Sequence, residues 1–364
     1  MNNTFGTLYS LTTFGESHGK VIGGVVDGCP AGIKIDTASI RRQLARRRPG
    51  QSAIVSKRQE ADKVIFLSGL IDNVTTGAPI AFVIENTDVR SADYDNLRDV
   101  FRPGHADYTY YVKYRGYNDT NGGGRSSARE TATRVVGGEI ARQVLACLEP
   151  SLVIRAYTKS VGNITMPPLK SLPTESQIEQ SPVRCPDASL SRDMERLIVE
   201  SCKEGDSVGG EVECIVSGCP VGIGEPIYDK LSARLASAMM SINAAKAFEI
   251  GMGFEGCRLR GSEVADNWIS DPSDRRGIRT AANHSGGIQG GISNGEDIVF
   301  RIGFKPTATM MKEMETVNRQ GEPVTLRAYG RHDTCIVPRA VPVVEAMAAM
   351  TLLDLILIDR ARHL

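Results

Sequence analysis

A short motif that occurs twice constrains the fold of this chain more than any other feature. Gly-Cys-Pro stands at residues 28–30 and again at 218–220, each time after an apolar run with a Gly-Gly pair and before a Gly-Ile pair. A stretch of helical character follows both copies. Such a repeat predicts two similar β-rich units packed with internal pseudo-symmetry, with halves at about residues 1–205 and 206–364. Because the spacing before the motif differs between the copies, two unrelated turns are the alternative.

Strand and helix signals both occur along the chain. Apolar runs at 21–26, 64–67, 80–84 and 297–304 predict strands, and 4–14 is typical of an extended segment. Helices are predicted after the cap residues Asp36 and Thr37 and at 127–148, 190–202, 228–242 and 341–358. Five prolines between residues 160 and 190 indicate an irregular connector. We therefore expect α+β, as a single large domain over residues 1–364.

Composition excludes several classes of protein. The chain has 43 Lys and Arg against 43 Asp and Glu, which argues against a general nucleic-acid or membrane surface. Its eight cysteines show neither C-x-x-C nor zinc-finger spacing, so we expect no metal site and buried thiols in a reducing cytoplasm. The N-terminus lacks a signal-peptide pattern, and Glu345 and Asp354 interrupt the richest apolar run. The sequence predicts a soluble, cytoplasmic protein without membrane or nucleic-acid partners.

The most distinctive local stretch is 121–139, where three glycines lead into a basic helix start. Ser127-x-x-Glu130 fits a capping box, and helix N-termini attract anions. Arg125, Arg129 and Arg134 add full positive charge there, which predicts a seat for a phosphate or carboxylate. The alternative is an ordinary capped helix with a solvated basic face.

Other cations stand in similar settings. Arg46, Arg47 and Arg48 end the first predicted helix just before Pro-Gly, where anion binding and a solvated face are about equally favoured. Residues 305–309, Lys-Pro-Thr-Ala-Thr, offer a cation and hydroxyls after a strand. Four of the five histidines lie in glycine- or arginine-rich loops: His18, His105, His284 and His332. This inventory suits a small polyanionic substrate, acid–base chemistry and a phosphorylated cofactor.

Two short motifs offer alternative enzyme classes. Residues 15–19 fit G-x-S-x-G, so a serine hydrolase could use Ser17 with His332 and Asp333, but too few residues precede the motif and a β-like run follows it. Residues 251–256 fit G-x-G-x-x-G. A dinucleotide site there is rejected because residues 241–247 have helical character, where the motif requires a preceding strand, and because residues 257–260 do not have the character of a helix start.

Several longer motifs together resemble the chorismate synthase family. They are Phe-Gly-Glu-Ser-His-Gly at 14–19, Arg-Pro-Gly-His-Ala-Asp-Tyr-Thr at 102–109, the glycine-rich stretch 122–130, Ser-Ile-Asn-Ala at 241–244, Gly-Gly-Ile-Gln-Gly-Gly at 286–291, Lys-Pro-Thr at 305–307 and Gly-Arg-His-Asp at 330–333. The resemblance runs in order from about Phe5 to the C-terminal helix.

The resemblance implies a lyase of the shikimate pathway. Its members convert 5-enolpyruvylshikimate 3-phosphate to chorismate and phosphate by a 1,4-anti elimination. They require reduced FMN without net redox change, the flavin lending electron density and accepting the C6 proton. They are homotetramers with a β-α-β sandwich core. Since no nicotinamide motif stands out, NADPH would act only indirectly, through an outside reductant.

Site roles also follow from the resemblance. His18 and His105 match the family's catalytic acids, and Asp333 matches the aspartate that helps deprotonate the flavin. Positions matching substrate phosphate and carboxylate contacts are Arg46, Arg47, Arg48, Arg129 and Arg134. Positions matching flavin contacts are Arg125, Ser126, Ser127, Asn243, Ala244, Gly290, Lys305, Pro306, Thr307, Ala308, Thr309 and Arg331. The chain departs from the family pattern around residues 51–58 and 115–121, which leaves the contacts of those loops open.

Overall fold

The computed structural model describes residues 3–51, 54, 60–88, 97–119, 122–169, 171–327 and 333–363. Its first sheet is antiparallel and comes from the N-terminal part of the chain, in the order β1-β2-β3-β7-β4. Alternate residues of its central strands, among them Ile22, Val26, Ile80 and Phe82, are buried on one face. The strands are β1 (Thr4–Phe5), β2 (Ser10–Gly15), β3 (Val21–Asp27), β4 (Val64–Phe66) and β7 (Ile80–Glu85).

A second antiparallel sheet has the order β11-β16-β10-β8-β9. Strand β16 alternates strictly, burying Ile298, Phe300 and Ile302, and β10 buries Val212 and Cys214 beside them. The strands are β8 (Val153–Val161), β9 (Ile164–Thr165), β10 (Gly210–Ser217), β11 (Ala245–Ile250) and β16 (Ile298–Phe304).

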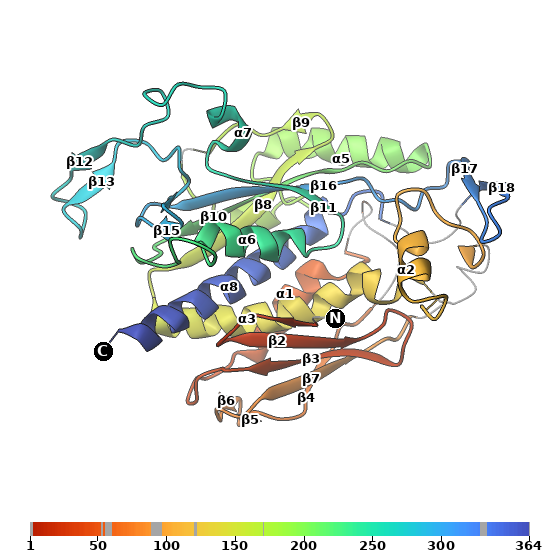
Figure 1. Cartoon of the computed structure of the whole chain (residues 1–364), viewed down its shortest axis with the longest axis horizontal. Coiled ribbons are helices and arrows are strands. Elements are labelled where there is room, and N and C mark those ends of the chain that lie inside the picture. The colour runs from red at the N-terminus through yellow and green to blue at the C-terminus, as the bar shows by residue number, and fades with distance from the viewer. Residues whose placement is uncertain are drawn as a thin grey trace.

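Helices fill the space between the two sheets (Figure 1). The long helices α3 (Thr131–Leu148) and α8 (Val337–Arg362) pack together there, with α1 (Thr37–Arg47) and α6 (Leu231–Met240) beside them. The two long helices approach closely at Gly138, where an added Cβ would lie 2.3 Å from the Cβ of Ala346. The core is thus a sheet–helix–sheet sandwich of the α+β class, as expected.

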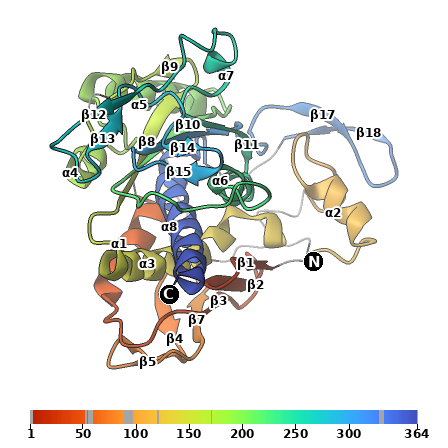
Figure 2. The ribbon, with the colours of Figure 1, turned by 60° about the vertical axis from the view of Figure 1, so that its left-hand side comes forward.

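Smaller elements decorate this sandwich. Figures 1 and 2 show α2 and the β17–β18 hairpin projecting at one end and the β12–β13 hairpin at the other. Helix α5 packs against β8 and β9. The remaining elements are α2 (Asp107–Lys113), α4 (Glu175–Glu179), α5 (Ala188–Lys203), α7 (Gly253–Gly256), β5 (Leu70–Ile71), β6 (Val74–Thr75), β12 (Trp268–Ser270), β13 (Ile278–Thr280), β14 (Ile288–Gln289), β15 (Ile292–Ser293), β17 (Met314–Val317), β18 (Pro323–Leu326) and the 3-10 turns Gly124–Ser126 and Ala128–Glu130.

Helix α8 is long and apolar enough to cross a membrane, contrary to the expectation from its two carboxylates. However, 89% of its most apolar window is buried inside the protein. The carboxylates have internal partners: Asp354 accepts the backbone N–H groups of Thr7, Leu8 and Tyr9. Asp354 therefore ties α8 to the link between β1 and β2, and the helix serves as the core of the sandwich.

The two Gly-Cys-Pro turns are held by matching hydrogen bonds. At the first, the Thr75 hydroxyl donates to the Pro30 carbonyl (2.6 Å) and accepts from the Ile33 N–H (2.9 Å). At the second, the Ser293 hydroxyl donates to the Pro220 carbonyl (2.5 Å) and accepts from the Ile223 N–H (2.8 Å). Each turn follows the middle strand of its sheet, β3 or β10.

Several expectations were wrong in detail. Residues 160–190 are not one irregular connector, because β8 and β9 enter them and α4 and α5 follow. Residues 245–250 form strand β11, so the helix expected before the G-x-G-x-x-G motif was wrong. That motif follows an edge strand, but the helix it opens has only four residues and ends at Gly256, so residues 257–260 start no helix, as expected. Since β8 and β9 belong to the second sheet, the division at about residue 205 does not separate the sheets.

Candidate active site

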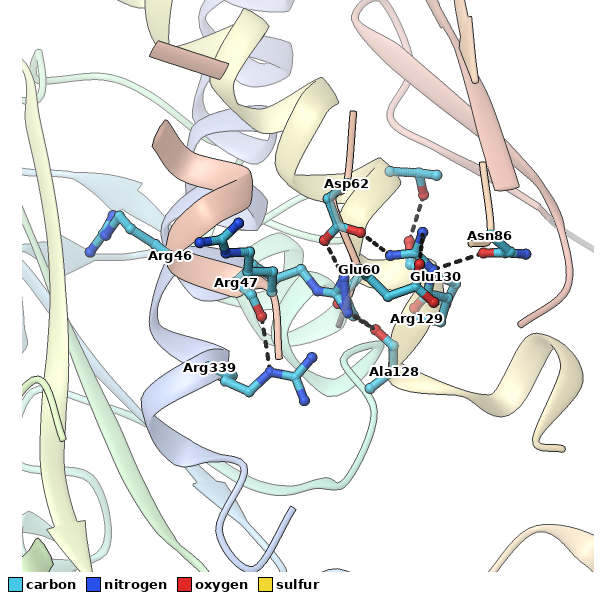
Figure 3. A network of polar contacts seen from close by, with 12 residues as sticks. Arg46, Arg47, Glu60, Asp62, Asn86, Ala128, Arg129, Glu130 and Arg339 are labelled. Carbon is cyan, nitrogen blue, oxygen red and sulfur yellow. Dashed lines mark hydrogen bonds and ion pairs between the residues drawn. The ribbon is translucent and has the colours of Figure 1, made fainter. Parts of the chain in front are cut away.

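One buried carboxylate joins two of the predicted substrate-binding arginines (Figure 3). Asp62 accepts from Arg47 Nη1 at 3.1 Å through one oxygen and pairs with Arg129 through the other. The three side chains are at most 3% exposed. Arg129 also donates to Asn86 Oδ1 (2.8 Å) and to the Glu85 carbonyl (3.1 Å). Both guanidiniums are therefore fixed in position by the fold.

This network extends in two directions. On one side Asn86 Nδ2 donates to the carbonyls of Glu16 (3.0 Å) and Gly19 (2.7 Å), which frame the His18 loop. On the other, Arg339 Nε donates to the Arg47 carbonyl at 2.9 Å. Arg339 also pairs with Asp333, whose carbonyl accepts from the Thr307 hydroxyl at 2.8 Å. Two predicted catalytic segments and the 305–309 segment thus share one hydrogen-bonded chain.

Burial and neighbouring charge shift the pKa values of this cluster. Burial, together with the nearby Arg339 and Arg129, lowers the pKa of Arg47 to about 10, although Asp62 opposes the change. Burial alone would raise the pKa of Asp62, but Arg47 and Arg129 hold it below its ordinary value. At neutral pH the cluster therefore holds charged arginines and an ionised aspartate.

The glycine loop at residues 122–124 packs against His18 through Gly122. The Ser17 Oγ lies 3.0 Å from His18 Nδ1. Gly122 has φ +133°, and a Cβ there would lie 2.4 Å from the same nitrogen. Only glycine fits beside the ring. Arg125 fixes the neighbouring strand end by donating to Thr13 Oγ1 at 2.7 Å.

The start of the basic helix differs from the capping box predicted for it. Ser127 Oγ accepts from the Arg129 N–H in a 3-10 turn, and α3 begins only at Thr131. Glu130 pairs with Arg134 instead of returning to cap the backbone. Because the backbone at 124–130 makes two 3-10 turns, the regular helix begins after Glu130 rather than directly after Ser127.

A second cluster surrounds His105. Its Nδ1 lies 2.6 Å from Asp107 Oδ1, and Arg102 contacts both oxygens of that carboxylate at 2.7 Å. Arg102 also donates to Thr309 Oγ1 (3.1 Å), and Lys305 Nζ donates to the Gly104 carbonyl (2.8 Å). The His105 loop is therefore attached to the 305–309 segment. Burial, then the charge of Lys246, lowers the pKa of Lys305.

The 241–244 turn connects the glycine stretch to the same region. Asn243 Nδ2 donates to the Ser126 carbonyl (2.9 Å), and Arg134 donates to Ser241 Oγ (2.7 Å). The carbonyl of Ala244, a residue at φ +65°, accepts from the Lys305 N–H (3.0 Å). The structure therefore brings Arg125, Ser126, Ser127, Asn243, Ala244 and residues 305–309 together from three distant parts of the sequence.

Comparison with known proteins identifies this arrangement. The family model for chorismate synthase matches residues 9–357. A chorismate synthase of Porphyromonas gingivalis is 57% identical over 360 residues, covering 99% of this chain and 96% of that protein. One of Bacteroides fragilis is 54% identical over the full length of both.

The chain belongs to the chorismate synthase family.

A solved crystal structure of a chorismate synthase agrees, with a TM-score of 0.74 and 30% identity over 96% of this chain and 91% of that one.

Membership in the chorismate synthase family implies a reduced flavin cofactor, and the described residues fit such a group. The Oδ1 of Asn243 is buried without a hydrogen-bond partner in the described part of the chain. It lies beside Ser126 and one residue from the turn that binds Lys305. An unpaired buried acceptor costs free energy, so it favours a ligand that donates a hydrogen bond there.

Some residues predicted for the site of this chorismate synthase family member lie outside the two clusters around Asp62 and His105. Arg46 is directed away from Arg47 (Figure 3) and pairs with Glu345 (2.5 Å) and Glu179 (2.7 Å). Arg48 is exposed beyond the end of α1. Gly290 lies in the β14–β15 hairpin, which precedes β16, whereas residues 305–309 follow the other end of that strand. Arg331 and His332 lie outside the described residues. His284 is in the same loop region as Asp266, with 3.6 Å between Nδ1 and Oδ1.

Five residues of the site were missed from the sequence: Asp62, Asn86, Arg102, Asp107 and Arg339. Sequence reasoning followed cations and histidines and gave no weight to the groups that hold them. Arg102 and Asp107 stood within a motif already recognised, three residues before and two residues after His105. Asp62, Asn86 and Arg339 offered no local signal.

The serine hydrolase alternative lacks support. The G-x-S-x-G segment joins β2 to β3 in an antiparallel hairpin, whereas a nucleophile elbow joins a strand to a helix. Ser17 is 1% exposed, and its hydroxyl faces the adjacent His18. Asp333 pairs with Arg339.

Proposed function

We propose that this chain converts 5-enolpyruvylshikimate 3-phosphate to chorismate and phosphate, a 1,4-anti elimination that requires reduced FMN without net redox change. The observation that carries the proposal is the continuous network from the His18 loop through Arg129, Asp62 and Arg47 to Asp333, in a member of this family. This network links fixed cations and acid–base groups through hydrogen bonds, and loss of phosphate requires both kinds of group close together.

The arginines have separate tasks in this scheme. Arg47 and Arg129 hold the substrate's phosphate and carboxylates, because their guanidiniums are preorganised by Asp62 and cost little to orient on binding. Arg134 stands at the edge of the same region, where it donates to Ser241. Arg48 belongs to the set carried over from the family, but it is exposed beyond the end of α1. Arg46 belongs to the set carried over from the family, but its two carboxylate partners give it a packing role between α1 and α8.

Three residues handle protons. His18 donates towards the departing phosphate, His105 acts as the second acid, and Asp333 helps to remove a proton from the cofactor. When bound, reduced flavin supplies transient electron density to the substrate. Residues of this chain hold it: Arg125, Ser126, Ser127, Asn243, Ala244, Lys305, Pro306, Thr307, Ala308 and Thr309. The set carried over from the family also includes Arg331 and Gly290, although Gly290 lies in the β14–β15 hairpin beyond the other end of β16. NADPH serves only through an outside reductant.

The assembly is a homotetramer in the cytoplasm. The outward face of the first sheet supports self-association, since Phe14, Ile65 and Leu67 on it are 42%, 39% and 63% exposed. The chain forms one domain with an internal pseudo-two-fold repeat. The matching bonds of Thr75 and Ser293 at the two Gly-Cys-Pro turns support this repeat, with its division near residue 150, between the sheets.

An anaerobic assay tests the activity. Chemically reduced FMN and 5-enolpyruvylshikimate 3-phosphate are mixed with the protein, and chorismate absorbance and phosphate release are followed together. We expect both products in equal amounts, and no turnover with NADPH and oxidised FMN unless a reductase is added. A folded protein that binds FMN and releases neither product would refute the proposal.

A further inference from the structure

His105 and Asp107 form an imidazole–carboxylate pair. His105 lies just before α2, and Asp107 is the first residue of that helix. The His105 Nδ1 and Asp107 Oδ1 are 2.6 Å apart, a short hydrogen bond. The two side chains are 22% and 20% exposed, so solvent reaches the pair only partly. Nothing in the sequence motif alone says which imidazole nitrogen carries the proton.

The surrounding contacts decide that question. Arg102 Nη2 lies 3.0 Å from the His105 Nδ1, but the same Nη2 donates to Asp107 Oδ1 at 2.7 Å. Arginine is always a donor. If Nδ1 lacked a proton, its lone pair would face the carboxylate oxygen at 2.6 Å, two acceptors in repulsive contact. Nδ1 therefore carries the proton, and the two nitrogens are close because both donate to one oxygen.

Asp107 is itself fixed and ionised. Arg102 Nε donates to Oδ2 at 2.7 Å, so the carboxylate is held by both oxygens. Burial alone would raise the pKa of Asp107, but hydrogen bonds from Arg102 and His105 hold it well below its ordinary range. Arg102 is anchored in turn on Thr309, and Lys305 on Gly104.

We propose that Asp107 is a positioning residue that keeps the His105 proton on Nδ1 and thereby leaves Nε2 to exchange protons with bound cofactor or substrate. The inference rests on the proposed function and adds to it the atom at which His105 works. Because Arg102 and Lys305 bind the 305–309 segment to the same loop, the orientation of His105 is set relative to the residues proposed to hold the flavin.

Nitrogen-15 NMR of the ligand-free protein tests the tautomer directly. The chain has five histidines, so selective labelling gives few signals, and His105→Gln identifies the one that matters. At a pH where this ring is neutral, we expect a protonated Nδ1 and an unprotonated Nε2 in the wild type. Asp107→Asn should shift the ring towards the Nε2–H form. A wild-type His105 with its proton on Nε2 would overturn the inference, whatever the protein catalyses.

Kinetics of the complete enzyme supply the second arm. We expect Asp107→Asn to lower kcat about tenfold or more with flavin affinity and KM within about twofold, and Asp107→Glu to restore part of the loss. The matched control is Asp359→Asn, which removes a carboxylate 3.4 Å from the exposed His363 and should leave kcat unchanged. An unchanged kcat in Asp107→Asn would also overturn the inference. If the wild type itself were inactive, the proposed function would fail and the NMR result would still decide the tautomer.

Discussion

Replacing Asp62 by Asn should destabilise this protein more than any other single charge-neutralising substitution in the candidate site. The substitution keeps the shape of the side chain and removes the negative charge between Arg47 and Arg129. Among the described residues, Asp62 is the only carboxylate within 4 Å of Arg47. Burial already lowers the pKa of Arg47 to about 10, so this charge depends on its partner.

The magnitude follows from the burial of the cluster. Removing one partner from a buried ion pair costs about 3–5 kcal/mol, because the remaining charge is left without compensation. Glu60 Oε2 lies 3.8 Å from Arg129 Nη2 and offsets part of that loss, which favours about 3 kcal/mol. For a chain of 364 residues, this corresponds to a fall in Tm of roughly 4 °C.

Calorimetry or a thermal-shift assay at pH 7 and low salt would measure this difference. The control is Asp193→Asn, which breaks an exposed pair with Arg196 and should change Tm by less than about 1 °C. The double variant Asp62→Asn with Arg47→Met should recover part of the loss, since it removes the buried charge along with its partner. If Asp62→Asn matched the exposed control, the description of Asp62 as the compensating charge would be wrong.

Four further outcomes are expected. Because the folded-state pKa of Asp62 is lowered, its contribution to stability is present above the unfolded pKa of about 3.9 and is lost below it. The Tm difference between wild type and Asp62→Asn should therefore shrink as the pH falls through about 4; a constant difference from pH 7 to 3 would contradict this. Gly122→Ala should lower kcat at least about tenfold, because its Cβ would strike His18. The control Gly222→Ala, with φ +102° and no atom within 4 Å, should lower stability alone. Equal kcat values in the two variants would contradict the predicted clash with His18. His105→Ala should reduce turnover more than about tenfold while titration with FMN gives a similar Kd, and undiminished turnover would remove His105 from the mechanism. Asn243→Ala should weaken FMN binding about fivefold, and an unchanged Kd would show that Oδ1 has no ligand.

Periodicity predicted most of the elements whose polar residues face solvent. Strands β3, β7 and β16 and helices α1, α5 and α8 all lie where the sequence indicates them, because their apolar spacing matches one buried face or a buried helix. Strand β8 was missed because its second half, residues 157–161, buries polar side chains. Thr158 donates to the Val183 carbonyl, and Lys159 pairs with Glu213. These partners come from distant parts of the chain, so no local pattern reveals that the segment is buried.

Strand β11 was misread for a related reason. Its sequence, Ala-Lys-Ala-Phe-Glu-Ile, has the composition of a helix. Pairing with β16 determines its conformation, with Phe248 opposite Ile302 and Glu249 opposite Arg301. Tertiary contacts outweigh propensity in so short a segment.

The candidate site shows the same division between what is local and what is not. The sequence indicated the cations and histidines because glycines, hydroxyls and arginines coincide in short stretches. It did not indicate their partners: Arg129 meets Asp62 from 67 residues away, and Arg46 meets Glu345 from 299 residues away. A cluster of arginines in a sequence was therefore interpreted as available positive charge, whereas the guanidiniums of Arg46, Arg47 and Arg129 are already paired with carboxylates.

That pairing bears on how such a site can turn over. A pocket of uncompensated guanidiniums would bind a phosphorylated substrate and the released phosphate with similar strength, and uniform binding of this kind does not raise kcat. In the proposed function, guanidiniums fixed by Asp62, with part of their charge compensated, would instead offer oriented donors whose attraction grows as negative charge develops on the departing phosphate. Under that proposal the buried aspartate does more than stabilise the fold, because it would moderate the field that the substrate meets while holding the two arginines in place.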